Sequence, residues 1–277
     1  TAGPPGAARR LRIGYQLRAG DPIAEARRAE ELGVDVVLVP DHVGSGWSPT
    51  PTLAAIAVVT ERIRLGTFVL NNDMRNPVQL AWEATTIDRL SNGRFELGLG
   101  AGHTPQEYDA TGIERSAPRE RKRRLAESVE IVRRLLDGET VDHDGEHHRV
   151  RAARINRSVQ ERLPILVGGN GAALLGHAGA HADIIGLQGL GRTSDDGHSH
   201  AVNWTADHLD EQIEQVRAGA GAPFDHLEFN ALVQVVQVTD DRDAALAAVC
   251  DRVEGLTMDD AAVVPYLLVG SVDEIVA

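Results

Sequence analysis

Two histidines in this chain stand where a polar loop follows an apolar run, a placement that suits acid–base chemistry. His42 comes directly after Asp41 and Pro40, and His103 follows the glycine-rich run at 98–102. Imidazole titrates near neutral pH, so either ring could exchange a proton with a substrate carbonyl or a ring nitrogen. Asp41 could orient His42 or cap the next turn. Short motifs also occur in ordinary loops, so an Asx turn with solvent-facing histidines stays open as the alternative.

Two further segments have the composition of ligand-binding loops. Phe68, Val69 and Leu70 lead into Asn71, so apolar side chains could lie under a planar ring while an amide meets its edge. An ordinary strand and turn would explain the same residues. The second segment consists of Gly168, Gly169, Asn170 and Gly171, and it lies between a predicted strand and the helix that follows. Exposed N–H groups at a helix start attract anions such as phosphate, although a flexible turn is again the alternative.

Three groups of histidines and acidic residues are dense enough to suggest metal binding: His143, Glu146, His147 and His148; His198 and His200 with Asp195 and Asp196; and His177 with His181. The first two groups lack the helical pair or the cysteine spacing of a zinc signature. The third has helical spacing, but Gly179 lies inside it near a helix end. We therefore expect structural or solvent-facing roles, and no metal.

The elements that must position these residues alternate regularly along the chain. Apolar runs predict seven strands, at 11–17, 34–39, 63–70, 95–99, 163–167, 183–187 and 227–238. Helical spacing predicts helices at 22–32, 52–61, 77–90, 120–136, 172–180, 205–217 and 243–253, with another starting at 271–277. Polar residues follow nearly every strand, which favours one (β/α)8 barrel over a doubly wound open sheet.

The expected barrel occupies the whole of residues 1–277 as a single domain, and its eighth strand is missing from this chain. The Gly-, Pro- and Ala-rich residues 1–8 are expected to be disordered. Two stretches are expected to be insertions into the barrel. Residues 138–160 alternate like a hairpin outside the main sheet, and residues 189–203 have the composition of a mobile loop.

Composition excludes several classes of function. The formal net charge of −13 opposes binding to a phosphate backbone, so we expect no nucleic-acid partner. No run approaches the roughly 20 apolar residues that span a bilayer, and no signal peptide is evident. Cys250 is the only cysteine and cannot form an internal disulfide. These features favour a cytoplasmic protein without a membrane partner.

Several longer segments, in order along the chain, resemble one protein family. They read IGYQLR at 13–18, LVPDHVG at 38–44, LGTFVLNNDMRNPVQLAWEATTIDRLSNGRFELGLGAG at 65–102, PILVGGNG at 164–171, HADIIGL at 181–187 and LLVGS at 267–271. Together they are similar to the luciferase-like monooxygenase superfamily, and most of all to its actinobacterial branch of oxidoreductases that depend on the deazaflavin coenzyme F420. The long central segment is the most specific of them.

The resemblance implies a (β/α)8 barrel with the cofactor ring above the carboxyl ends of the strands. It places Asp41 and His42 near the reactive face of the ring and a non-prolyl cis peptide at Phe68-Val69 against it, with Leu70 and Asn71 following. It also assigns Ala101, Gly102 and Gln106 to the ring or tail, and 168–171 to the tail phosphate. One departure concerns His103, which stands where deazaflavin-dependent sugar-phosphate dehydrogenases have an acidic residue.

These inferences lead to one main hypothesis and two alternatives. The main hypothesis is hydride transfer between F420 and a small organic substrate, with His42 or His103 exchanging a proton. The first alternative is an FMN-dependent monooxygenase on the same barrel. The second is a non-catalytic barrel that has lost a complete cofactor pocket. The apolar face of the helix at 77–90 is suited to a homodimer, which is frequent in this family.

Overall fold

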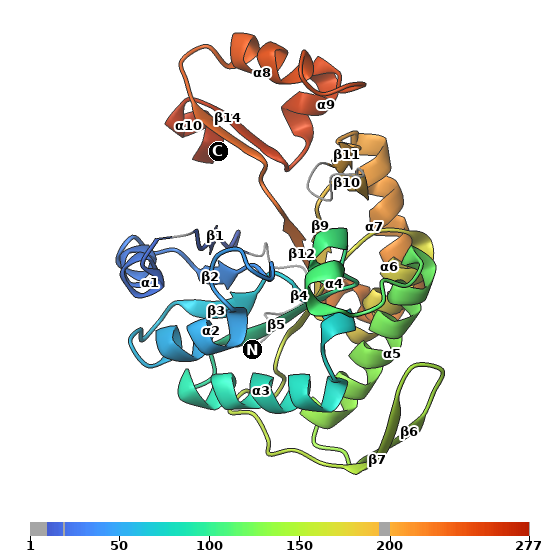
Figure 1. Ribbon diagram of the computed structural model, residues 1–277. Coiled ribbons are helices and arrows are strands. Elements are labelled where there is room, and N and C mark those ends of the chain that lie inside the picture. Colours follow the sequence, from blue (N-terminus) through green and yellow to red (C-terminus); the bar gives the residue numbers. More distant parts are fainter. Residues whose placement is uncertain (1–9, 19, 194–199, 277) are drawn as a thin grey trace.

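A curved parallel sheet forms the centre of the molecule in the computed structural model, which describes residues 10–18, 20–193 and 200–276 (Figure 1). Seven strands follow one another in the order of the chain: β1 (Gly14–Gln16), β2 (Val36–Val39), β3 (Arg64–Thr67), β5 (Phe95–Gly100), β8 (Ile165–Gly168), β9 (Ile184–Leu187) and β12 (Glu228–Ala231). All neighbouring pairs are parallel. Their carboxyl ends therefore meet at one rim, as the barrel prediction requires.

Six helices cover the outer face of this sheet (Figure 1). They are α1 (Pro22–Glu31), α2 (Pro49–Ala57), α3 (Pro77–Leu90), α5 (Pro118–Leu136), α6 (Ala172–His181) and α7 (Ala206–Ala220). Helix α3 has the predicted bounds. Asn76 caps its start by accepting from the N–H groups of Val78 and Gln79, and Asn92 and Gly93 end it with positive φ angles.

Strand β2 shows why the strands read as continuous apolar runs. Val37 and Val39 belong to the large core between sheet and helices, whereas Val36 and Leu38 belong to a smaller cluster. That second cluster includes Phe68 from the segment after β3, so it lies on the concave side of the sheet. Since successive side chains in a strand point to opposite faces, both faces of β2 are covered.

The third predicted strand is interrupted at its end. Strand β3 stops at Thr67, the Phe68-Val69 peptide bond is cis, and β4 (Leu70–Asn71) then pairs with β5. Glycines on β5 make room for this bulge. A Cβ on Gly98 would lie 2.0 Å from the Thr67 carbonyl oxygen. The cis peptide that the resemblance implied is thus confirmed.

The prediction of one long strand at 227–238 was wrong. Strand β12 ends at Ala231, and the chain then leaves the main sheet as β13 (Val235–Val238). Strand β13 pairs in parallel with β14 (Leu267–Gly270), which the sequence analysis did not assign as a strand. In the described part of the chain no eighth strand joins the main sheet between β12 and β1.

The residues after β12 form a small lobe of their own, at the top of Figure 1. It contains β13, β14, α8 (Arg242–Cys250), α9 (Met258–Val263) and α10 (Val272–Val276). Its core is a separate apolar cluster that includes Leu246 and Tyr266, and Trp204 from the segment before α7 packs into it. Helix α9 was not predicted, while α8 and α10 fall where helices were expected.

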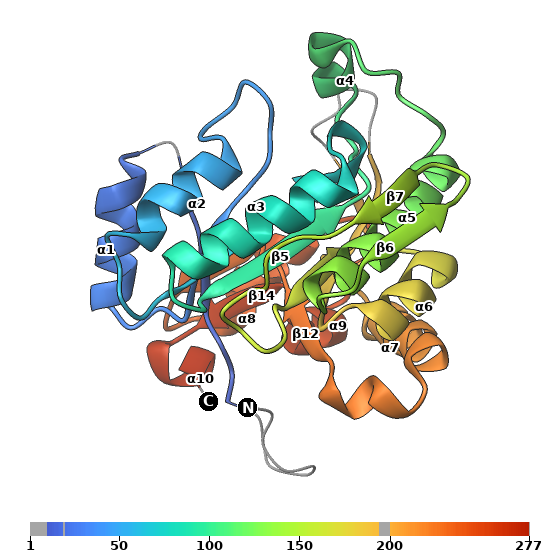
Figure 2. The same cartoon turned by 90° about the horizontal axis from the view of Figure 1, so that it is seen from below.

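Two hairpins extend from the barrel. Strands β6 (Val141–Asp144) and β7 (Arg149–Ala153) pair antiparallel and confirm the hairpin predicted at 138–160 (Figure 2). Strands β10 (Leu190–Thr193) and β11 (His200–Val202) also pair antiparallel, where a loop had been expected. Residues 194–199 between them, like the segment 1–8 that was expected to be disordered, lie outside the described residues. None of the described helices is long and apolar enough to cross a membrane.

Candidate active site

A cavity of about 190 Å³ opens at the carboxyl ends of the strands. Eight residues singled out in the sequence line it: Asp41, His42, Phe68, Val69, Leu70, Asn71, Gly102 and His103. The lining also includes four residues that the sequence analysis did not single out: Gln16, Glu107, Gln188 and Leu232. They come from the ends of β1, β9 and β12 and from α4 (Pro105–Thr111), which stands above the rim (Figure 2).

Glu107 holds His42 in place. Nδ1 of His42 lies 2.7 Å from Oε1 of Glu107. The carboxylate side chain is only 9% exposed, whereas the imidazole is 44% exposed. A buried carboxylate on Nδ1 fixes the orientation of the ring and leaves Nε2 as the nitrogen available to a ligand.

His103 faces the same imidazole. The two rings meet edge to face with centroids 5.7 Å apart, so both predicted acid–base candidates share one cavity. His103 lies in the loop that leads into α4, and Arg115 donates a hydrogen bond of 3.2 Å to its carbonyl oxygen.

Asp41 does not orient His42, contrary to one of the expectations above. Its carboxylate accepts hydrogen bonds from both terminal nitrogens of Arg75 and from the backbone N–H of Asn71, the last at 2.8 Å. A bidentate arginine pair is geometrically specific. Asp41 therefore ties the loop after β2 to the loop after β4, and so fixes the rim of the cavity.

Asn71 presents a buried donor at the cavity. Its Nδ2 atom has no hydrogen-bond partner among the described residues. Its Oδ1 atom accepts from the N–H of Asp73 at 3.1 Å. Gly102, at φ +70°, packs so closely that a Cβ there would lie 2.4 Å from Oδ1 of Asn71 and 2.3 Å from the Tyr108 hydroxyl.

Burial and the neighbouring Asp73 raise the pKa of Tyr108 to about 12, so its hydroxyl stays protonated.

The glycine loop at 168–171 lies beside this cavity rather than in its lining. A Cβ on Gly168 would lie 3.4 Å from Cγ1 of Val69 and 3.7 Å from Nε2 of Gln188. Nζ of Lys122 donates to the carbonyl oxygen of Asn170 at 2.8 Å and to its side-chain oxygen at 3.0 Å. Burial lowers the pKa of Lys122, and the positive charge of Arg121 lowers it further. A cation and the start of α6 thus converge on this loop.

Two other predicted residues, Ala101 and Gln106, also lie outside the lining. Arg121 donates to the carbonyl oxygens of Ala101 and Gly102 at 3.2 and 3.3 Å, so Ala101 connects the rim to α5. Gln106 precedes Glu107 on α4. The adjacent Glu107 was missed because its partner, His42, lies 65 positions away in the sequence. A glutamate one turn beyond His103 was the only local signal.

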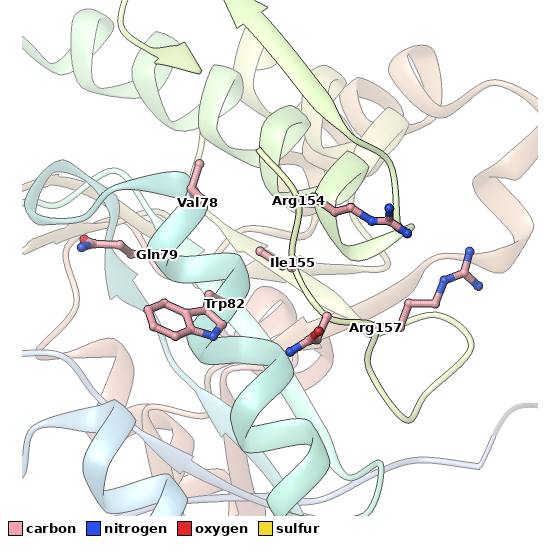
Figure 3. Close-up of a pocket in the computed structure, with 8 residues that line it drawn as sticks. Val78, Gln79, Trp82, Arg154, Ile155 and Arg157 are labelled. Carbon is pink, nitrogen blue, oxygen red and sulfur yellow. The ribbon is translucent and has the colours of Figure 1, made fainter. Parts of the chain in front are cut away.

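A larger cavity, of about 570 Å³, lies away from the strand ends (Figure 3). It is formed by Val78, Gln79 and Trp82 on α3 and by the segment 154–157 after β7. Neither a histidine nor a carboxylate lines it. Because the potential acid–base groups gather at the strand ends, the smaller cavity is the better candidate for chemistry.

Comparison with known proteins identifies the family. Residues 8–266 match the luciferase-like monooxygenase family. The chain belongs to this family. Its relatives include an F420-dependent glucose-6-phosphate dehydrogenase from Amycolatopsis mediterranei, which is 32% identical over 186 residues, or 62% of this chain and 56% of the relative. The chain thus spans about half the length of several curated relatives that it matches.

Solved structures support the same fold. An F420-dependent secondary alcohol dehydrogenase in complex with an F420–acetone adduct aligns with a TM-score of 0.71 at 20% identity, covering 96% of this chain and 87% of that one. The monooxygenase RslO1 from Streptomyces bottropensis aligns with a TM-score of 0.70 at 24% identity, covering 96% and 86%. At these identities the alignments establish the luciferase-like barrel fold alone.

Proposed function

We propose that this chain is an F420-dependent oxidoreductase that transfers a hydride between the deazaflavin and a small organic substrate. The observation that carries the proposal is the His42–Glu107 pair, whose atoms lie 2.7 Å apart at the rim of the strand-end cavity. The dehydrogenases among the curated relatives support the choice of cofactor. When bound, the deazaflavin ring would accept or donate the hydride.

The residues around the cavity suit a deazaflavin. The bulge at Phe68 and Val69 offers apolar backing for a planar ring. Nδ2 of Asn71, which has no hydrogen-bond partner among the described residues, can donate to a carbonyl at the edge of that ring. Lys122 and the start of α6 would hold the phosphate of the cofactor tail at Asn170 and its neighbouring glycines.

His42 would handle the proton that accompanies hydride transfer. Oxidation of an alcohol removes a hydride from carbon and a proton from the hydroxyl oxygen. Nε2 of His42 would take this proton, and the buried carboxylate of Glu107 would stabilise the imidazolium that results. His103, edge to face with His42, would contact the substrate and help to select it.

Cofactor binding separates this proposal from its alternatives. The purified chain is titrated with F420 and, separately, with FMN, and cofactor fluorescence is followed. Saturable binding of F420, with much weaker binding of FMN, is the expected result. Preferential binding of FMN would favour a monooxygenase. If the protein is folded by circular dichroism and binds neither cofactor, the non-catalytic alternative is favoured.

We also propose that the protein works in the cytoplasm as a homodimer. A single cysteine suits a reducing compartment. Trp82 and Leu90 on the outer face of α3 are exposed and could be covered by a second copy. Light scattering of the purified chain, and of its Trp82→Glu variant, tests the dimer. A monomeric parent chain would overturn it.

A further inference from the structure

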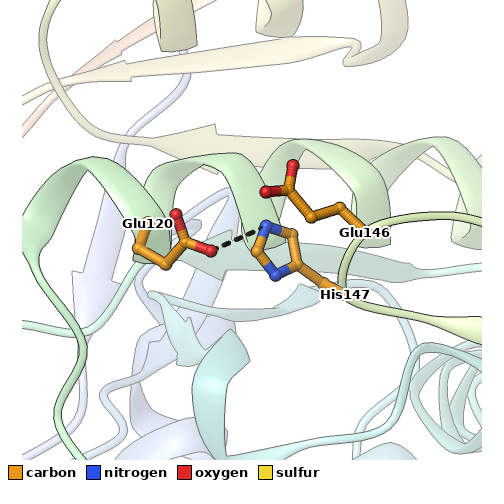
Figure 4. Close-up of side chains that lie close together, drawn as sticks. All are labelled: Glu120, Glu146 and His147. Atoms are coloured by element: carbon orange, nitrogen blue, oxygen red, sulfur yellow. Dashed lines mark ion pairs between the residues drawn. The ribbon is translucent and has the colours of Figure 1, made fainter.

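Three potential metal ligands converge outside the candidate active site. Glu120 lies in the first turn of α5, and Glu146 and His147 lie at the tip of the β6–β7 hairpin. One ligand atom from each lies within 4.8 Å of the others. Figure 4 shows the imidazole of His147 directed toward Glu120, with the carboxylate of Glu146 nearby.

His147 is the most informative member of this group. Its side chain is only 6% exposed, and its Nε2 atom has no hydrogen-bond partner within the described chain. Nε2 lies 3.4 Å from Oε1 of Glu120, beyond the usual hydrogen-bond range. A tetrahedral zinc site with bonds of about 2.0–2.1 Å separates neighbouring ligand atoms by about 3.3–3.4 Å. The observed spacing therefore suits two ligands of one ion better than a hydrogen-bonded pair.

The hairpin tip is held rigidly enough to present this imidazole. Oε2 and Oε1 of Glu127 on α5 accept from the backbone N–H groups of His147 and His148 at 2.9 and 2.8 Å. Nε2 of His143 lies 2.8 Å from the same carboxylate. A Cβ on Gly145 would lie 1.9 Å from Oε1 of Glu127, so the tip packs directly on the helix. A ligand position fixed before binding lowers the entropic cost of binding.

We propose that Glu120, Glu146 and His147 form a binding site for one Zn²⁺ ion. One imidazole and two carboxylates are ligands that zinc accepts, and three protein ligands leave a fourth position for water. The sequence analysis assigned no metal to this hairpin because its own residues lack a zinc signature. The third ligand comes from α5, 26 positions before Glu146, and only the fold brings it close.

Arg123 is the competitor for this site. Its guanidinium contacts the carboxylates of both Glu120 and Glu146, so it neutralises them when no ion is bound. A zinc ion must displace this cation. Removing the arginine should therefore tighten zinc binding, which gives the proposal a gain-of-affinity test.

Bound zinc would connect the hairpin to the first turns of α5. The same turns carry Arg121 and Lys122, which contact the loops at 101–102 and at Asn170. The ion would hold these two cations in position and raise the temperature of unfolding, because it binds the folded chain alone. The ion takes no part in hydride transfer. The zinc site can therefore be tested independently of whether the chain binds F420.

The test is a zinc titration of the full chain after chelator treatment, with a chromophoric chelator as competitor. We expect one tightly bound Zn²⁺ per chain. His147→Gln should weaken it more than about tenfold, because even outer-shell ligand partners typically contribute that much. Arg123→Gln should tighten it. Two matched controls should leave it unchanged: His208→Gln, from a partly exposed His–Glu pair on α7, and Arg149→Gln, from an exposed ion pair on the same hairpin.

Other outcomes overturn the proposal. Tight binding that survives His147→Gln would place the ion elsewhere, and the absence of saturable binding to the parent chain would remove the site. If circular dichroism shows that His147→Gln is unfolded, the zinc affinities of the two arginine variants test the proposal instead. Equal zinc affinity in Arg123→Gln and Arg149→Gln would then refute it.

Discussion

The two ends of the barrel use charged residues in opposite ways. At the amino-terminal end, the Glu96 carboxylate at the start of β5 is 6% exposed and contacts both Arg12 and Arg64. Arg12 also reaches Glu228 at the start of β12, 2.7 Å away. This network links the first and last strands of the main sheet across the position where the described residues contain no eighth strand.

At the carboxyl-terminal end, the charges are placed so that some groups stay available. Glu107 is buried, but its partner His42 is partly exposed. Nδ2 of Asn71 is buried without a partner among the described residues. Buried polar groups are normally satisfied, so an available donor beside a cavity indicates ligand binding. The charged groups at the amino-terminal end thus satisfy one another, whereas those at the carboxyl-terminal end include groups that the proposed function would use to bind a ligand.

The largest effect should come from His42→Gln at the carboxyl end. Turnover should fall about 10²- to 10⁴-fold, because the proton acceptor is lost. Stability should change by less than about 1 kcal/mol, since glutamine can still donate to Glu107. Steady-state kinetics with F420 and urea unfolding measure the two quantities. An unchanged kcat would remove His42 from the chemistry.

Glu96→Gln should give the reverse pattern at the amino end. We expect a loss of about 3 kcal/mol in the free energy of unfolding, because two arginines lose a buried carboxylate. Cofactor affinity should be unchanged. The control is Glu31→Gln, from an exposed pair with Arg28, which should cost less than about 0.5 kcal/mol. Equal effects of the two substitutions would contradict the structural role of the network.

Lys122→Gln tests the anion site beside the cavity. F420 should bind about tenfold more weakly, because a charged hydrogen bond contributes roughly 1.5–3 kcal/mol. A deazaflavin chromophore without the phosphate tail should bind as before. Arg134→Gln removes the same charge at the far end of α5, where Arg134 pairs with Glu139, and serves as the control. Equal weakening for the tailed and the tail-less ligand would place the lysine at the ring instead.

The smallest effect concerns pH and the amino end. Burial alone would raise the pKa of Glu30, but hydrogen bonds from the N–H groups of Ile63, Arg62 and Glu61 hold it below its usual value of 4.5. The ionised Glu30 therefore stabilises the folded state above pH 4.5, and this stabilisation is lost as the pH falls through the lower pKa of the folded state. Urea unfolding at several pH values should show a shallower acid loss for Glu30→Gln. An identical acid slope would argue against this contribution.

The sequence by itself determined most strands and helices of the main sheet, because their signals are local. Apolar periodicity, the cap at Asn76 and the stop at 91–93 lie within or beside the helix they define. The same local patterns placed polar residues after the strands, and parallel strands bring such residues to one rim. That reasoning was sufficient to collect His42, His103 and Asn71 around one cavity, whereas the bulge at Phe68-Val69 was expected only from the family resemblance.

Only the tertiary structure decided which distant residues meet. Val235–Val238 has the pattern of a strand in any sheet, and its partner at Leu267–Gly270 came from a lobe that the sequence did not reveal. The partner of His42 lies 65 positions away, and the third ligand of the proposed zinc site comes from another element. Such pairings depend on how helices and loops pack in three dimensions, and no local pattern of residues encodes that.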